Sequence, residues 1–176
     1  MSDPRYSRPA RLLHWTVSGL VAVTIPVGIA MTSEGFRAQG DVLYITHKGI
    51  GVVLLVLVLA RAAYRVVVPP PPLPDSVPDR ERRIAGATHA FLYVLLIFQG
   101  VTGYLRTVAG DFPIELLDVL GVPPLIGEHP DLARRLSVAH KIGAYALVAT
   151  VSVHVAAVLH HALILRDGIL GRMWPP

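Results

Sequence analysis

The chain has 176 residues, of which 53% are hydrophobic and only 16% are charged, and its mean hydropathy is +0.55. Soluble globular domains carry about 25% charged residues, so the composition argues against a soluble enzyme and excludes a disordered chain. The absence of cysteine excludes disulfides, Cys-ligated iron–sulfur clusters and thioether-attached haem. In so apolar a chain, the net charge of +4 indicates membrane sidedness and not nucleic-acid binding.

Four apolar segments are long enough to cross a bilayer as helices, for which about 20 residues suffice. They are predicted at about residues 12–31, 44–68, 84–105 and 136–165. The first is too long for a signal-peptide core and lacks a cleavage site, and Pro69–Pro72 end the second. We therefore predict one all-α domain, residues 1–176, folded as an integral membrane four-helix bundle.

The third connection, from about residue 106 to 135, is the longest between the predicted spans. Pro113 is suited to the first position of a helix, where its missing N–H costs nothing. The stretch 114–120 that follows has an apolar stripe on one face. Such a stripe predicts a short helix that lies on the membrane surface.

Orientation follows from the distribution of Lys and Arg around the spans. The side with both termini and residues 61–83 carries ten: Arg5, Arg8, Arg11, Arg61, Arg65, Arg80, Arg82, Arg83, Arg166 and Arg172. The other side carries six: Arg37, Lys48, Arg106, Arg134, Arg135 and Lys141. The positive-inside rule therefore places both termini in the cytoplasm and the third connection on the exoplasmic side.

Histidine is the most informative residue type, since seven of the eight histidines lie in or at the ends of the spans. Imidazole is costly to place in hydrocarbon and so suggests a function. The spans contain no Asp or Glu, which excludes a carboxylate-bridged di-iron bundle and sites for hard cations. Pairs of neutral imidazoles instead suit the two axial positions of a b-type haem.

The spacing of the histidines predicts two such pairs. His140 and His154 are 14 residues apart, about 40° short of four full helical turns, so both face one side at depths about 21 Å apart. His47, near the exoplasmic start of its span, matches the depth of His140. His14, near the cytoplasmic start of its span, is the best partner for His154. We expect these four residues to be the iron ligands.

The residues around the ligands suggest how haem is held. Thr46–Gly51 and Ala139–Gly143 resemble each other, and their glycines leave room for a flat macrocycle. Lys48 and Lys141 are candidate partners for haem propionates, although Lys48, Lys141 and Arg134–Arg135 are equally suited to anchoring helix ends at the interface. Arg61, 14 residues after His47, is the candidate partner for a propionate of the inner haem.

The remaining histidines leave alternatives open. Any single intramembrane histidine is also consistent with a polar contact between helices. His89 has no obvious opposite number and is interpreted as a hydrogen-bonding residue. His160 and His161 are alternatives to His154 opposite His14, and His129 is expected to be solvated in a loop.

The chain resembles the prokaryotic cytochrome b(561) family over nearly its whole length. The resemblance is carried by Arg5-Tyr6-Ser7-Arg8, His14-Trp15, His47-Lys48-Gly49, the His140/His154 pair and Arg172-Met173-Trp174-Pro175. It implies a multi-pass protein of the bacterial inner membrane with two non-covalent b haems, held by His14 with His154 and by His47 with His140. It also implies quinone as one redox partner and, in some members, superoxide as the periplasmic electron donor.

The leading hypothesis is a membrane cytochrome that moves electrons from an exoplasmic donor, with superoxide as a candidate, to the quinone pool. Such a protein is a superoxide:quinone oxidoreductase or an electron-transfer subunit, and no catalytic residue is assigned. The alternative is a haem-containing anchor or electron-transfer subunit of a larger dehydrogenase or hydrogenase. A homodimer and a larger redox complex are the candidate assemblies. A proton or metal transporter is disfavoured because the spans lack carboxylates.

Overall fold

The structure is a computed structural model that describes residues 5–74 and 77–174. Its elements are α1 (Arg8–Ala30), the 3-10 helix η1 (Glu34–Gln39), α2 (Gly40–Val67), α3 (Asp79–Ala109), α4 (Glu115–Val119), α5 (Pro130–Leu159), the π-helix η2 (His160–Leu165) and the 3-10 helix η3 (Leu170–Arg172). The described part contains helices and no strands. The predicted all-α bundle, with a short helix in the third connection, is confirmed.

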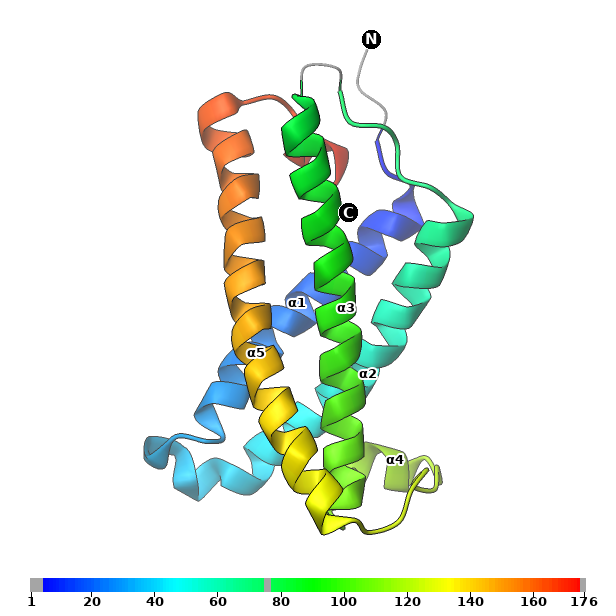
Figure 1. Cartoon of the computed structure of the whole chain (residues 1–176), viewed down its shortest axis with the longest axis vertical. Helices are drawn as coiled ribbons and strands as arrows, with labels where there is room; N and C mark the ends of the chain where they lie inside the picture. Colours follow the sequence, from blue (N-terminus) through cyan, green and yellow to red (C-terminus); the bar gives the residue numbers. More distant parts are fainter. Residues whose placement is uncertain (1–4, 75–76, 175–176) are drawn as a thin grey trace.

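The four long helices pack in sequence order as pairs: α1 against α2, α2 against α3, and α3 against α5 (Figure 1). Both ends of the described chain lie at one end of the bundle, where the backbone N–H of Tyr6 donates to the carbonyl of Arg172 at 3.1 Å. We call this the termini end. The short helix α4 lies at the opposite end of the bundle, which we call the α4 end (Figure 1).

Each long helix extends beyond the apolar run that predicts it, because backbone hydrogen bonding continues into the polar residues at its ends. Pro9 and Pro130 lie in the first turns of α1 and α5, where the missing proline N–H leaves no intrahelical bond unmade. Asp79 and Glu81 lie in the first turn of α3, where the helix dipole favours negative charge. The helices α1, α2 and α3 are therefore longer than the predicted segments, whereas α5 begins six residues before its segment and ends at Leu159, where the π-helix η2 follows.

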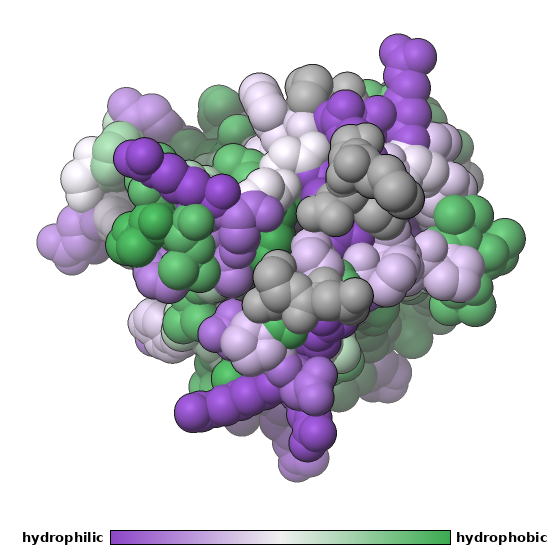
Figure 2. Space-filling view, turned by 90° about the horizontal axis from the view of Figure 1, so that it is seen from above, coloured by the Kyte–Doolittle hydropathy of each residue, from purple (hydrophilic) through white to green (hydrophobic). Residues whose placement is uncertain are grey.

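The chain is a multi-pass membrane protein, since four of its helical segments are long and apolar enough to cross a bilayer. Only 6% to 11% of the most apolar window of each segment is buried inside the protein. Many of the other apolar side chains are exposed on the outside of the bundle, as expected for helices that contact lipid. Figure 2 views the termini end, where hydrophilic side chains project outward beside hydrophobic ones.

A small core lies between α1 and α2, formed by Val17 and Val21 from α1 and by Leu54 and Val58 from α2. Val58 is only 1% exposed. In sequence, the two valines of α1 fall between His14 and Thr24, and the two residues of α2 fall between His47 and Arg61. This core therefore separates two levels of polar side chains inside the bundle.

The C-terminal segment is fastened to the termini end by Arg172, which is only 3% exposed. Its Nη2 atom donates to the carbonyls of Pro71, at 3.1 Å, and Pro72, at 2.7 Å. Trp15 Nε1 donates to the carbonyl of Met173 at 3.0 Å, and the Trp15 ring packs edge-on against Trp174 with ring centres 5.0 Å apart. The start of α1, the proline-rich connection and the C-terminal segment thus form one packed unit.

Candidate functional site

Five histidines lie inside the bundle in two groups on either side of the core. The α4-end pair consists of His47 on α2 and His140 on α5. The termini-end triad consists of His14 on α1, His89 on α3 and His154 on α5. All four histidines that the sequence predicts as ligands therefore belong to these two groups, and His89 joins one of them.

The α4-end pair has the separation that two axial ligands of one metal need. The ring centres of His47 and His140 are 6.3 Å apart, and the ring planes meet at 86°. A metal–imidazole nitrogen bond is about 2 Å long and the ring centre lies about 1 Å beyond the nitrogen, so two imidazoles on opposite sides of one metal have centres about 6 Å apart. The spacing fits a single iron between the two rings.

Glycines on neighbouring helices make room for both imidazoles. A Cβ atom at Gly28 of α1 would lie 2.9 Å from Cε1 of His47, and one at Gly103 of α3 would lie 3.1 Å from Cε1 of His140. Both distances are shorter than ordinary contacts of a Cβ atom. Each ring of the pair is therefore packed directly on a helix backbone.

A cavity of about 990 Å³ opens beside the α4-end pair, between α2, α3, α5 and the segment that contains α4. Its volume is within the range of cofactor sites, about 300–1,000 Å³. Its lining includes both histidines, and Oε1 of Gln99, another lining residue, is buried without a hydrogen-bond partner. Buried polar atoms are normally paired, so Gln99 suggests that another group completes this site. The residues present fit a haem bound by two histidines.

The glycines that follow the two predicted ligands have different surroundings. Gly51 lines the cavity, as expected for a residue that makes room for a macrocycle. Gly143 instead packs against α3, where an added Cβ would lie 2.6 Å from Oε1 of Gln99. The similar motifs after His47 and His140 therefore serve the cavity in one case and helix packing in the other.

Three basic residues line this cavity: Lys48, Arg106 and Arg134. Lys141, which the sequence predicts as a propionate partner, is exposed and lies outside the lining. Lys48 Nζ donates to Glu115 Oε1 at 2.8 Å and to the carbonyl of Pro113 at 2.6 Å, so it ties α4 to α2. Sequence reasoning missed this link because Lys48 lies 65 residues from Pro113 and 67 residues from Glu115 in the chain.

The link also sets the charge state of Glu115. Burial acts to raise the pKa of the Glu115 carboxyl, but the hydrogen bond and positive charge of Lys48 hold that pKa below its ordinary value. The carboxylate is therefore ionised at neutral pH, beside a cavity that also contains Arg106 and Arg134. The α4 end combines a histidine pair with a rim of mixed charge, because Asp41 and Glu115 line the cavity beside the three basic residues, and Arg134 pairs with Asp131 at 3.3 Å.

The termini-end triad is more crowded than the α4-end pair. The rings of His89 and His154 contact edge-on, with centres 5.3 Å and planes at 70°. His14 lies close enough to both for their charges to interact. Sequence reasoning found no partner for His89, because the depth at which α3 crosses α5 is set by packing and not by helical spacing.

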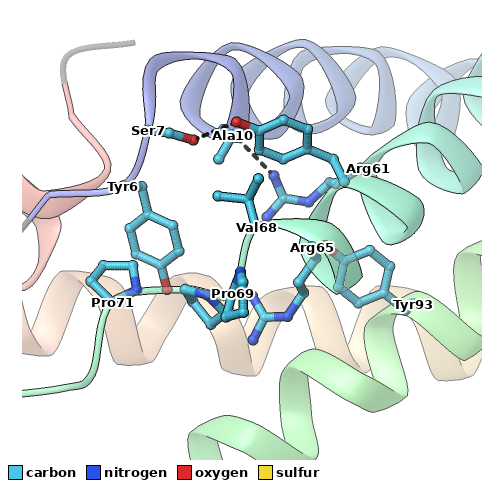
Figure 3. Close-up of a pocket in the computed structure, with 11 residues that line it drawn as sticks. Tyr6, Ser7, Ala10, Arg61, Arg65, Val68, Pro69, Pro71 and Tyr93 are labelled. Atoms are coloured by element: carbon cyan, nitrogen blue, oxygen red, sulfur yellow. Dashed lines mark hydrogen bonds between the residues drawn. The ribbon is translucent and has the colours of Figure 1, made fainter.

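Arg61 lies beside this triad, between α1 and α3 (Figure 3). Its Nη1 atom donates to the carbonyl of Ala10 at 3.1 Å, and its guanidinium carbon is 5.7 Å from the centre of the Tyr93 ring. Its pocket, of about 30 Å³, is also lined by Arg65 and contains no acidic residue. Among the residues that the structure describes, no carboxylate pairs with Arg61, and a largely buried cation in such surroundings fits an acidic group of a bound cofactor.

The other histidines lie outside the two groups. His161 pairs with Asp167 through Nδ1 and Oδ2, and His160 contacts His161 with ring centres 6.0 Å apart. Both belong to η2, beyond the end of α5. His129 immediately precedes α5, and its backbone N–H donates to the carbonyl of Ala109 at 2.8 Å.

The chain is similar to known proteins over nearly its whole length. Residues 5–176 match the family described as prokaryotic cytochrome b561. Cytochrome b561 homolog 2 of Escherichia coli (strain K12) is 30% identical over 174 residues, covering 96% of this chain and 90% of the relative. Cytochrome b562 of Cereibacter sphaeroides is 26% identical over 180 residues, covering 99% of this chain and 98% of the relative. The matched residues include both histidine groups.

Proposed function

Because the chain belongs to the prokaryotic cytochrome b561 family, whose members are membrane b-type cytochromes of electron transfer, we propose that it binds two haems and passes electrons across the membrane. The α4-end pair binds one haem between His47 and His140. His14 and His154 bind the other at the termini end. The 6.3 Å separation of the α4-end rings, beside a cavity of about 990 Å³, is the observation that carries this proposal.

The protein's own part is to hold, orient and shield the two cofactors. When bound, haem b supplies the one-electron redox chemistry. The imidazoles of each pair would hold the iron, and the close approach of Gly28 and Gly103 sets the positions of the His47 and His140 rings. Arg61, whose pocket is lined by no carboxylate, would pair with an acidic group of the termini-end haem. At the α4 end, Lys48, Arg106 and Arg134 line the cavity and are the propionate partners we propose, whereas Lys141 lies outside the lining.

The bundle is oriented with its termini end in the cytoplasm and its α4 end on the exoplasmic side of a bacterial inner membrane. The support is the count of ten basic residues on the first side against six on the second. Arg106 and Arg134 line the α4-end cavity and would attract a small anion, against the opposing charges of Asp41 and Glu115 in the same lining. Superoxide is the anionic donor we propose. Each superoxide gives one electron and leaves as dioxygen, and two electrons with two protons convert quinone to quinol.

Haem content tests the proposal directly. The purified protein, in detergent or in lipid nanodiscs, is expected to contain two haems b per chain. Acid acetone is expected to extract both, because no cysteine is present to form thioether bonds. A measured content of one or none would contradict the assignment of four ligands.

The electron donor is tested separately by stopped-flow spectroscopy. Superoxide is expected to reduce the α4-end haem at a rate that falls with rising ionic strength, since salt screens the attraction of the anion to Arg106 and Arg134. Arg106→Gln with Arg134→Gln is expected to slow reduction at low salt, and Arg80→Gln on the other side serves as control. No reduction by superoxide, with two haems present, would leave an electron carrier with a different donor, as in a subunit of a larger redox complex.

A further inference from the structure

Both rings of the α4-end pair contact a threonine on a neighbouring helix. Oγ1 of Thr24, on α1, lies 3.4 Å from Nδ1 of His47. Oγ1 of Thr102, on α3, lies 3.1 Å from Nδ1 of His140. In both cases the contact is made to Nδ1, the ring nitrogen next to the side-chain stem, which leaves Nε2 as the nitrogen available to a ligand.

The direction of the hydrogen bond between Thr102 and His140 can be deduced. Thr102 is only 4% exposed, and its hydroxyl donates to the carbonyl of Phe98 at 2.6 Å. A hydroxyl has one proton to donate and two lone pairs that accept. With the proton committed to Phe98, the hydroxyl accepts from His140, so the proton of the neutral imidazole is on Nδ1 and Nε2 carries the lone pair.

The contacts of the two rings are alike, since a threonine hydroxyl meets Nδ1 in each case. The rings nevertheless come from different helices and pack against different ones.

Hydroxyl and glycine act from the same helix in each case. Thr24 and Gly28 are one turn apart on α1 and both contact the His47 ring. Thr102 and Gly103 are adjacent on α3 and both contact the His140 ring. Each imidazole therefore has one edge fixed by a hydrogen bond and another placed against helix backbone, which restricts its rotation.

We propose that Thr24 and Thr102 are positioning residues that set the tautomer and orientation of the α4-end ligands, so that Nε2 of His47 and of His140 faces the iron. The inference rests on the proposed function, because it assumes haem at this pair. Metal-bound histidines generally donate their second N–H to a fixed acceptor, which orients the ring and raises the basicity of the ligand. Thr102 has the stronger effect, since its contact is shorter.

A half-buried threonine that bonds only to its own helix provides the control. Thr150 on α5 donates to the carbonyl of Ala146 at 2.7 Å, as Thr102 does to Phe98, but no hydrogen bond joins its side chain to a histidine among the described residues. Replacing Thr150 therefore removes the same kind of intrahelical bond without removing a hydrogen bond to a ligand. A difference between Thr102→Val and Thr150→Val isolates the contact with His140.

The experiment measures haem release and reduction potential in the purified full-length protein. Transfer of haem to excess apomyoglobin gives the release rate, and a redox titration gives the potential of each haem. Thr102→Val is expected to release the α4-end haem about 10- to 100-fold faster, the usual cost of losing such a partner. It is also expected to raise that haem's potential, because a less basic ligand stabilises oxidised iron less.

Thr24→Val is expected to act in the same direction with a smaller effect. Thr102→Ser keeps the hydroxyl and is expected to behave as the parent protein, as is Thr150→Val. The inference would be overturned if Thr102→Val gave the same haem release rate and potential as Thr150→Val, or if Thr102→Ser released haem as fast as Thr102→Val. If Thr102→Val does not fold, Thr102→Ala and Thr24→Val decide on the same criteria. His140→Ala, which is expected to remove the α4-end haem, tests the proposed function independently of the threonines. A failure of the proposed function is therefore distinguishable from a failure of this inference.

Discussion

The two histidine groups differ in the space that the protein leaves for a cofactor beside them. At the α4 end, two rings stand 6.3 Å apart beside a cavity of about 990 Å³. At the termini end, His89 and His154 are in contact at 5.3 Å, and the neighbouring pocket around Arg61 encloses only about 30 Å³. A shared helix, α5, therefore does not impose equal sites, because the helices opposite it determine how much space each ligand has.

The largest expected effect comes from removing the ligands themselves. His47→Ala and His140→Ala are each expected to cause loss of the α4-end haem and keep the other, since each removes one of the two protein ligands of a haem that is not covalently attached. His14→Ala and His154→Ala are expected to abolish the termini-end haem only. Haem per chain and the reduced spectrum check this, and His129→Ala, in the connection before α5, is the control. Loss of the same haem from His14→Ala and His47→Ala would show that the two groups are not separate sites.

Replacing His89 tests which two histidines of the termini-end triad bind the haem. If His14 and His154 are the ligands, His89→Ala is expected to keep two haems per chain and to change only the potential or spectrum of one of them. Loss of the termini-end haem from His89→Ala, with His14→Ala harmless, would instead identify His89 and His154 as the pair. His160→Ala provides the comparison for a histidine beyond the end of α5.

Glycine substitutions test how tightly the imidazoles of the α4-end pair pack against the neighbouring helices. Gly103→Ala and Gly28→Ala each bring a Cβ to about 3 Å from an imidazole, so they are expected to displace the ring and lower stability by about 1–3 kcal/mol. Gly19→Ala, on the same helix as Gly28, meets nothing within 4 Å and is expected to be neutral or stabilising. Thermal unfolding and haem retention measure both. Equal behaviour of the three variants would mean that the close contacts do not constrain the rings.

The smallest expected effect is on the attachment of α4. Because the pKa of Glu115 is lowered in the folded protein, the link to Lys48 is present above the ordinary glutamate pKa of about 4.3 and is lost as pH falls through the lowered value. A spin label on Val119→Cys, in a chain otherwise without cysteine, is expected to become more mobile at acidic pH. Adding Glu115→Gln is expected to give the mobile spectrum already at neutral pH and to remove the pH dependence.

Much of the bundle follows from periodicity and hydrophobic length. The positions of the long helices and of the short helix at 115–119 could be predicted because apolar runs and an apolar stripe are local features. The depth match between His47 and His140 also follows from the sequence, since both residues lie near helix starts at the same end of the bundle.

The contacts of His89, Lys48 and Thr24 could not be predicted in the same way. Each depends on the rotation and crossing of two helices, which arise from packing among residues far apart in sequence. The contact between Lys48 and Glu115 spans 67 residues, and the one between Thr102 and His140 spans 38. Helical spacing identifies the face on which a side chain lies, but not the side chain it meets.

Arg172 bears on the order in which the protein is made. Its bonds to the carbonyls of Pro71 and Pro72 join segments about one hundred residues apart, so they form only after the segment that contains Arg172 has been translated. During synthesis from the N-terminus, α1 and α2 are therefore inserted before Arg172 can bond to the proline-rich connection beside them. We expect the termini end to be the last region of the bundle to mature, so loading of its cofactor follows the docking of the segment around Arg172.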